Sequence, residues 1–256
     1  SSAASDVYKR QLIDLSTYTK EDASVKAIAD RIIGEVDAEY GKVFAKTEVE
    51  LNGDKEPGNR TEETNMGDLI TDAMMWAVKT RMPSINMENA VALTNGGGIR
   101  EALAKGDISK KSLLAVFPFG NTVATIDVTG AQLLEALEAA TCTTPEAIGA
   151  FPQVSGIEFT LNTGVPYVNG TQYANSTYYA PANPGSRVTI STVNGEAFDP
   201  AATYTIATND FTAKGGDTYG VFKTAGGWKD VGVSLEDALI NYTTEELDRM
   251  MEEQGE

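Results

Sequence analysis

The sequence predicts an α+β fold, with a mixed β-sheet flanked by helices. Two hydrophobic patterns occur along its 256 residues, one with helical spacing and one in short apolar runs typical of strands. Helices and strands do not follow a strict β-α-β order, which favours an α+β or mixed-sheet domain over a doubly wound one. With 41% hydrophobic residues, the chain can bury a full core as one large domain, or as one domain with an appendage.

Two helices are predicted in the first third of the chain. Residues 22–44 predict an amphipathic helix because apolar residues recur at helical spacing. Its apolar side consists of Val25, Ile28, Ala29, Ile32, Val36 and Tyr40. After a polar stretch with Gly and Pro, a second helix is expected from a cap at Thr64 or Asn65. Its methionines, including Met66 and Met74, are interpreted as core filler.

Beyond the second helix, strand and helix patterns are mixed. Strands are predicted at residues 90–93, 122–128, 156–161, 187–192 and 204–208. Helices are predicted at 130–141, where Thr129 and Gln132 have capping-box spacing, and at 234–248. The segment 162–186, rich in Asn, Gly, Pro and Tyr, is expected to be a loop insertion.

The composition excludes several classes of function. A net charge of −17 disfavours nucleic acid and anionic membranes as partners. The chain has no histidine, so it is a poor candidate for catalytic zinc, di-metal phosphatase or Ser-His-Asp chemistry. The single cysteine, Cys142, is interpreted as structural, and no run approaches the ~18 apolar residues of a membrane span. We therefore expect a binding function, with no catalytic residue and no metal site in this chain.

Two turns that follow apolar stretches could contact a ligand. NGGGIR, Asn95 to Arg100, follows a predicted strand and does not match either glycine-rich nucleotide-binding loop. It is either a plain turn or a place where backbone approaches a ligand closely. FPFGN carries Phe119 between Pro and Gly, so this ring either stacks on a flat ligand or packs in the core.

Two further stretches carry charged candidates. NDFTAKGGDTY contains Phe211 and Asp217, and the carboxylate could either accept hydrogen bonds from vicinal hydroxyls or cap the turn. Arg60 lies five residues before Asn65, at the expected start of the second helix. It could form part of an anion site there or remain a solvated surface residue.

Together these stretches resemble the C-terminal domain of the 5′-nucleotidase family, which includes bacterial UDP-sugar hydrolases and animal ecto-5′-nucleotidases. The resemblance spans roughly residues 60–220. It is carried by NRTEETNMGDLITDAM, LTNGGGIR, GDISKKSLLAVFPFGNTV, FPQVSGIEF and YTIATNDFTAKGGDTY. The family resemblance implies a substrate-binding domain.

The resemblance also implies a role for each candidate residue. Phe119 and Phe211 match an aromatic pair that sandwiches the nucleobase, and Asp217 matches the acidic residue that holds the ribose hydroxyls. The residues that match the lining of the nucleoside pocket are Asn95, Gly96, Gly97 and Gly98. Arg60 and Arg100 match arginines that reach toward the phosphate.

Catalysis in this family belongs to an N-terminal metallophosphoesterase domain with two divalent metals. Residues 1–21 look like the tail of that domain or the linker from it, and 22–256 resemble the substrate-binding domain. The C-terminus stops where relatives continue into a short final strand. The expected partners are an AMP-like nucleotide or nucleoside and the catalytic domain, and no cofactor is expected in this chain. The chain alone is expected to be inactive, and the family implies a secreted, periplasmic or cell-surface location.

Alternatives remain within and outside this class. The domain could serve a UDP-sugar or 2′,3′-cyclic nucleotide hydrolase, or it could be a non-enzymatic nucleoside-binding or surface interaction domain. Two departures concern the site. Thr218 stands where many members have glycine, which predicts an altered turn because Thr resists positive φ. Glu56 lies where some members have a second arginine.

Overall fold

The computed structural model describes residues 14–247. Contacts divide the chain into two compact units, Ser1–Tyr40 and Gly41–Glu256. The first unit contains a short 3-10 helix, η1 (Leu15–Thr17), and the helix α2 (Ala23–Tyr40). None of the helices in the described part of the chain is long and apolar enough to span a membrane.

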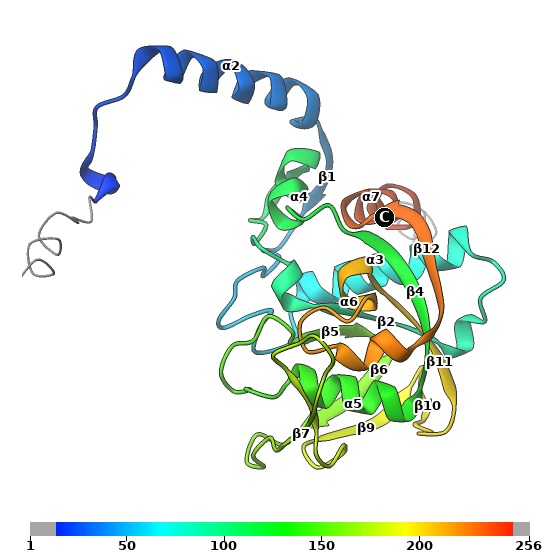
Figure 1. Ribbon diagram of the computed structural model, residues 1–256. Helices are drawn as coiled ribbons and strands as arrows, with labels where there is room; N and C mark the ends of the chain where they lie inside the picture. Colours follow the sequence, from blue (N-terminus) through cyan, green and yellow to red (C-terminus); the bar gives the residue numbers. More distant parts are fainter. Residues whose placement is uncertain (1–13, 248–256) are drawn as a thin grey trace, which may run out of the picture. The chain divides into compact units, whose positions relative to one another are not determined.

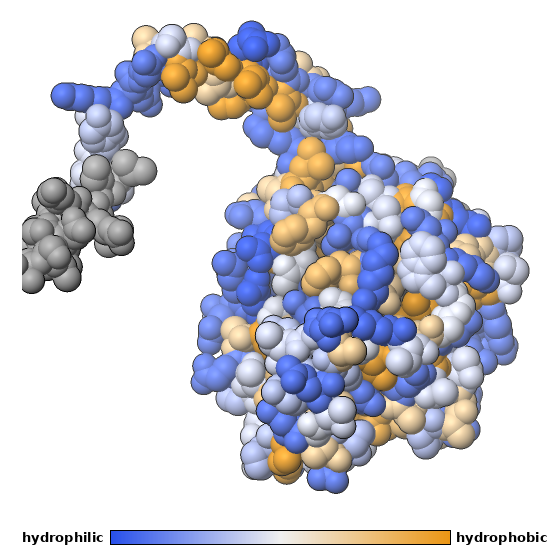
Figure 2. Space-filling view, in the orientation of Figure 1, coloured by the Kyte–Doolittle hydropathy of each residue, from blue (hydrophilic) through white to orange (hydrophobic). Residues whose placement is uncertain are grey.

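Helix α2 confirms most of the helix predicted at 22–44. The Asp22 carboxylate accepts hydrogen bonds from the backbone N–H of Ser24 and of Val25, which caps the helix start. No residue of α2 is buried. Val25 and the three isoleucines of this helix are exposed beside charged residues, and Figure 2 shows apolar and hydrophilic side chains along it.

The second unit is built on a five-stranded mixed sheet, as the sequence predicts (Figure 1). In spatial order the strands are β12 (Gly226–Ser234), β4 (Thr122–Thr129), β11 (Thr203–Asn209), β2 (Ala90–Asn95) and β5 (Pro152–Ser155). The pair β11 and β2 is parallel. The other three neighbouring pairs are antiparallel.

Both faces of this sheet are covered (Figure 1). On one face lie α3 (Asn65–Arg81), α4 (Lys110–Val116) and α7 (Leu235–Asn241). On the other lie α5 (Gly130–Ala140) and a three-stranded sheet of β10 (Glu196–Ala197), β9 (Val188–Val193) and β6 (Ile157–Leu161). Along β2 the side chains alternate between the cores: Ala92 packs in the first, Val91 and Leu93 in the second.

The sequence-based start signals of two helices are confirmed. Thr64 is the N-cap of α3, and its hydroxyl accepts a 3.0 Å hydrogen bond from the Gly67 N–H. Thr129 and Gln132 form the expected capping box at α5. Met66 and Met74 are almost fully buried in the first core, which confirms their interpretation as core filler.

Other elements are not predicted by the sequence patterns. The segment 162–186 contains a two-stranded hairpin of β7 (Asn169–Gln172) and β8 (Tyr179–Pro181). The last predicted helix is shorter and continues as a π-helical stretch, η5 (Tyr242–Leu247). Two short strands, β1 (Val43–Thr47) and β3 (Gly106–Ser109), form a separate ribbon. The remaining short helices are η2 (Met87–Asn89), η3 (Gly96–Gly98), α6 (Asp210–Ala213) and η4 (Gly220–Thr224).

Candidate functional site

Four strands of the central sheet bring their connecting turns to one edge. Because β2 and β11 are parallel, their carboxyl ends, Asn95 and Asn209, lie side by side. β4 runs antiparallel to β11 and β5 antiparallel to β2, so both begin at this edge. The register places Val123 opposite Asn209 and Pro152 opposite Asn95. The turns before β4 and β5 therefore meet the turns after β2 and β11.

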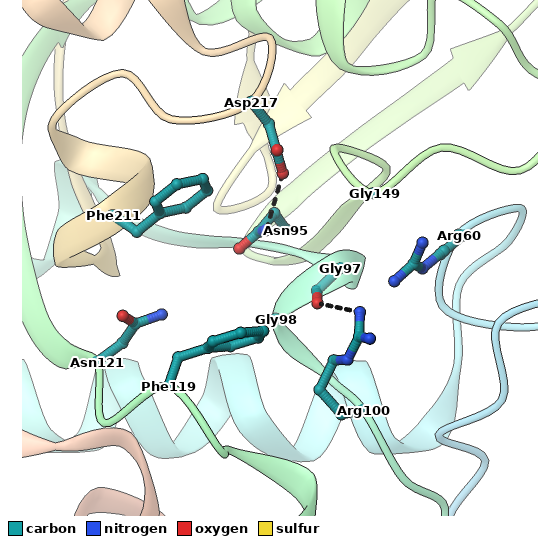
Figure 3. Close-up of a pocket in the computed structure, with 10 residues that line it drawn as sticks. All are labelled: Arg60, Asn95, Gly97, Gly98, Arg100, Phe119, Asn121, Gly149, Phe211 and Asp217. Atoms are coloured by element: carbon teal, nitrogen blue, oxygen red, sulfur yellow. Dashed lines mark hydrogen bonds between the residues drawn. The ribbon is translucent and has the colours of Figure 1, made fainter.

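These turns and the loop that carries Arg60 line a pocket of about 300 Å³ (Figure 3). Its lining residues are Arg60, Asn95, Gly97, Gly98, Arg100, Phe119, Asn121, Gly149, Phe211 and Asp217. Eight of the nine residues singled out in the sequence are among them. The exception is Gly96, which is buried beneath the turn. A Cβ on Gly96 would lie 1.8 Å from the Asn59 carbonyl oxygen, so this glycine allows two backbone segments to touch.

The two phenylalanines are exposed, although apolar side chains of this size are usually buried. Phe119 is 59% exposed and Phe211 is 42% exposed, so neither ring is core packing. Both rings border the same opening in Figure 3. The ring of Phe211 packs directly on Gly216, where a Cβ would lie 2.5 Å from the ring. The second glycine of the GGD turn is thus required by this contact.

Asp217 is fixed by a polar network that links β2 to β11. The Asn95 side-chain amide donates to Asp217 Oδ2 over 3.0 Å, and Asn95 Oδ1 accepts from Asn209 Nδ2 over 2.9 Å. Asn209 in turn caps α6, because its Oδ1 accepts from the Thr212 N–H over 2.8 Å. Burial raises the pKa of Asp217, while the Asn95 hydrogen bond and the Arg60 charge oppose that rise. The network holds this carboxylate on the pocket wall.

In the turn that contains Thr218, the residue with positive φ is Asp217 and not the threonine. Asp217 adopts the left-handed conformation, with φ of 48°, and Thr218 is not among the described residues with positive φ. Aspartate tolerates this region better than most non-glycine residues. Thr218 is buried, and the neighbouring Tyr219 hydroxyl donates to the Ala150 carbonyl over 2.6 Å. The turn therefore accommodates threonine without positive φ at that position.

The two arginines lie at one end of the pocket (Figure 3). The Arg100 guanidinium lies 5.8 Å from the centre of the Phe119 ring and donates to the Gly97 carbonyl over 3.4 Å. Arg60 Nε is buried and makes no hydrogen bond within the described residues. Burial and the nearby Arg100 charge lower the pKa of Arg60, whereas Asp217 raises it. A buried guanidinium whose charge is disfavoured by a second guanidinium nearby forms a site suited to an anion.

The loop that carries Arg60 is tied to the rest of the site through its backbone. The Arg60 carbonyl accepts from the Ile148 N–H over 3.1 Å. The buried Gln153 side chain accepts from the Thr64 N–H and donates to the carbonyls of Asn59 and Glu62. These contacts set where the guanidinium of Arg60 can reach.

Sequence reasoning does not single out Asn121 and Gly149 as site residues. Asn121 is the last residue of the quoted FPFGN stretch, so a signal is present for it. Gly149 lies in the turn before β5, a strand that the sequence does not predict. Its carbonyl accepts from the Gly97 N–H over 2.7 Å, so that N–H already has a protein partner. In the described residues no group of three or more His, Cys, Asp or Glu side chains could hold a metal ion.

Comparison with known proteins places this fold and pocket in a family. The family model described as the 5′-nucleotidase, C-terminal domain matches residues 43–224. The chain belongs to that family. All ten pocket residues lie within the matched range.

Relatives of this 5′-nucleotidase C-terminal domain are much longer proteins. The chain is 36% identical over 228 residues to the trifunctional nucleotide phosphoesterase protein YfkN of Bacillus subtilis, and covers 14% of it. It is 32% identical over 199 residues to protein UshA of Escherichia coli, and covers 30% of it. These alignments include 86% and 78% of this chain.

A solved structure supports the same assignment. The crystal structure of the 5′-nucleotidase precursor from Thermus thermophilus is 33% identical, with a TM-score of 0.67. The match covers 86% of this chain and 39% of that one. The chain thus spans well under half the length of each of these three relatives.

Proposed function

We propose that this domain binds the nucleoside part of a nucleotide and presents its phosphate to a separate di-metal catalytic domain. The set of chemical groups around the pocket carries this proposal. In Figure 3 the two phenylalanines lie on one side of the opening and the two arginines on the other, with Asp217 above them, where it is bonded to Asn95. Aromatic faces suit a base, a carboxylate suits vicinal hydroxyls, and guanidiniums suit phosphate. A nucleotide carries these three parts on one molecule.

In this proposal the chain binds and orients but does not cleave. Phe119 and Phe211 hold the base, Asp217 accepts hydrogen bonds from the ribose, and Arg60 and Arg100 direct the phosphate. The metals, when bound in the separate domain, supply the Lewis-acid chemistry of phosphoester hydrolysis. The length of the relatives beyond the aligned region leaves room for such a domain.

The experiment compares AMP with adenosine by calorimetry on the wild type, Arg100→Ala and Arg60→Ala. At a net charge of −17 the overall field repels AMP, so a preference for AMP must come from local cations. We expect Arg100→Ala, and less strongly Arg60→Ala, to weaken AMP binding while adenosine binding stays nearly unchanged. Raising salt is expected to weaken AMP binding more in the wild type than in the double variant.

Arg81→Ala is the matched control. It removes the same charge from α3, at a residue that is exposed and does not line the pocket. We expect it to bind both ligands as the wild type does. Equal losses for AMP and adenosine in the pocket variants would mean that the arginines hold the fold and do not bind the phosphate. Including UDP-glucose among the ligands tests the UDP-sugar alternative on the same samples.

A further inference from the structure

The tip of the hairpin formed by β7 and β8 packs against η4, the short helix that follows the turn carrying Asp217. The Tyr173 ring lies on Gly220, where a Cβ would be 2.2 Å from Tyr173 Cγ. A second contact joins the same two segments, because Lys223 Nζ donates to the Ala174 carbonyl over 3.0 Å. Gly220 and Lys223 belong to η4, which follows the Asp217 turn almost directly. The hairpin tip, residues 173–178, is therefore a neighbour of the pocket.

Hydrogen bonds give this tip a defined shape. The Tyr173 N–H donates to the Tyr178 carbonyl over 3.0 Å, and the Tyr178 N–H donates to Ser176 Oγ over 3.1 Å. The tip is also tied to α5, because the Tyr173 hydroxyl donates to Glu135 Oε1 over 2.8 Å. A tip built in this way can hold a side chain in one place.

Tyr178 is the tip residue that pairs with Tyr173, whose ring packs on Gly220, three residues after Asp217. Its side chain is 37% exposed, and its hydroxyl makes no hydrogen bond to another described residue. Burial and then the negative charge of Asp217 raise the pKa of Tyr178, so the phenol keeps its proton and remains a donor. Asp217 Oδ2 already accepts from Asn95, whereas Oδ1 has no protein donor in the described residues. The pairing with Tyr173 therefore places a phenol that has no protein partner in the described residues beside the turn that carries a carboxylate oxygen with no protein donor.

We propose that Tyr178 is a further ligand-binding residue, whose hydroxyl donates to a ribose hydroxyl that in turn donates to Asp217. This rests on the proposed nucleoside-binding function and narrows it. The pair selects ligands with a free vicinal diol, the class of ribonucleosides and ribonucleotides, over deoxy analogues. It also assigns a role to the insertion 162–186, whose tip extends the ligand site beyond the ten residues that line the pocket.

The test is a cycle of protein and ligand changes with the full chain. Wild type, Tyr178→Phe and Tyr179→Phe are titrated with whichever of adenosine and uridine binds more tightly, and with its 2′-deoxy and 3′-deoxy forms. We expect Tyr178→Phe to weaken binding of the ribonucleoside by about 3- to 10-fold, the usual range for one neutral hydrogen bond. The penalty for removing one of the two ribose hydroxyls is expected to shrink in this variant. Tyr179→Phe removes the same atom from the adjacent residue and is expected to behave as the wild type.

The outcomes separate the two proposals. If the wild type binds the ribonucleoside but Tyr178→Phe binds it equally well, the role of Tyr178 is wrong and nucleoside binding stands. Equal losses for the ribonucleoside and both deoxy forms would also overturn the contact with a hydroxyl. If the wild type binds neither nucleoside, the proposed function falls and this inference falls with it. Thermal unfolding of each variant shows whether the hairpin remains folded.

Discussion

The exposed rings of Phe119 and Phe211 allow a direct test of the proposed base site. If Phe119 and Phe211 both stack on the base, replacing either by Ala should weaken nucleoside binding by about 1–3 kcal/mol. Calorimetry with adenosine measures the loss. Far-UV spectra are expected to stay unchanged because neither ring is part of the core. If either variant unfolds, its ring holds the fold and the sandwich assignment is wrong.

Asp217 predicts a pH dependence. Its carboxylate is the form that accepts hydrogen bonds from ribose, and its pKa is raised from 3.8 by burial. Nucleoside binding should therefore weaken as the pH falls through that raised value, earlier than an exposed aspartate would allow. The contribution of Asp217 to the free energy of unfolding changes with pH in the opposite direction. The native state holds the Asp217 proton more tightly than the unfolded state, so this contribution falls as pH rises from about 3.8.

Asp217→Asn isolates this dependence. Asparagine also tolerates positive φ, so the turn should keep its shape. Adenosine titrations between about pH 4 and pH 7 are expected to show weaker binding at neutral pH than in the wild type, and little further loss in acid. If adenosine affinity in this variant still falls in acid as it does in the wild type, the titrating group is not Asp217.

At single residues, the sequence indicates which residues lie at the pocket better than it indicates how each one is buried or what its backbone conformation is. Family resemblance located eight pocket residues, but not that Gly96 lies under the turn. It could not place positive φ at Asp217 in preference to Thr218, because that depends on how Phe211 packs on Gly216 and Tyr219 bonds to Ala150. The second of these contacts joins residues 69 positions apart in the sequence.

At the scale of elements, Gln153 at the start of β5 connects three parts of the Arg60 loop. Gln153→Leu leaves the Thr64 N–H and the carbonyls of Asn59 and Glu62 without this partner in a buried setting. We expect a loss of about 2–4 kcal/mol in the free energy of unfolding. Urea denaturation measures this loss. Because Arg60 follows Asn59 directly, AMP binding should weaken more than adenosine binding. Equal weakening of both would mean a general loosening of the pocket.

The elements found from sequence are those with a clear apolar pattern. β2 and β4 are short, largely buried runs, and the helices α3 and α5 have apolar stripes. The sequence does not reveal β12, because its first half is exposed and glycine-rich and its register with β4 is irregular. Nor does it reveal the hairpin of β7 and β8, because NGTQ has no apolar alternation and the strands depend on packing against α5 and η4.

At the scale of the whole molecule, the sheet order explains why the site lies at one edge. One parallel pair between antiparallel neighbours brings two strand ends and two strand starts together. The residues that meet there come from positions 60 to 217 in the sequence. Local patterns predict that a mixed sheet forms, but they do not fix the strand order that creates the pocket.

The composition of the whole chain predicts that it does not hydrolyse nucleotides alone. It has no histidine, and no group of acidic or cysteine side chains in the described part could hold a metal ion. With Zn²⁺, Mn²⁺ or Mg²⁺ added, we expect no phosphate release from AMP or UDP-glucose, measured against the intact Bacillus subtilis relative as positive control. Metal-dependent turnover that co-purifies with the chain through several columns would contradict this. That turnover would have to be lost in Asp217→Asn or Phe211→Ala, because a contaminating phosphatase would be indifferent to changes in this pocket.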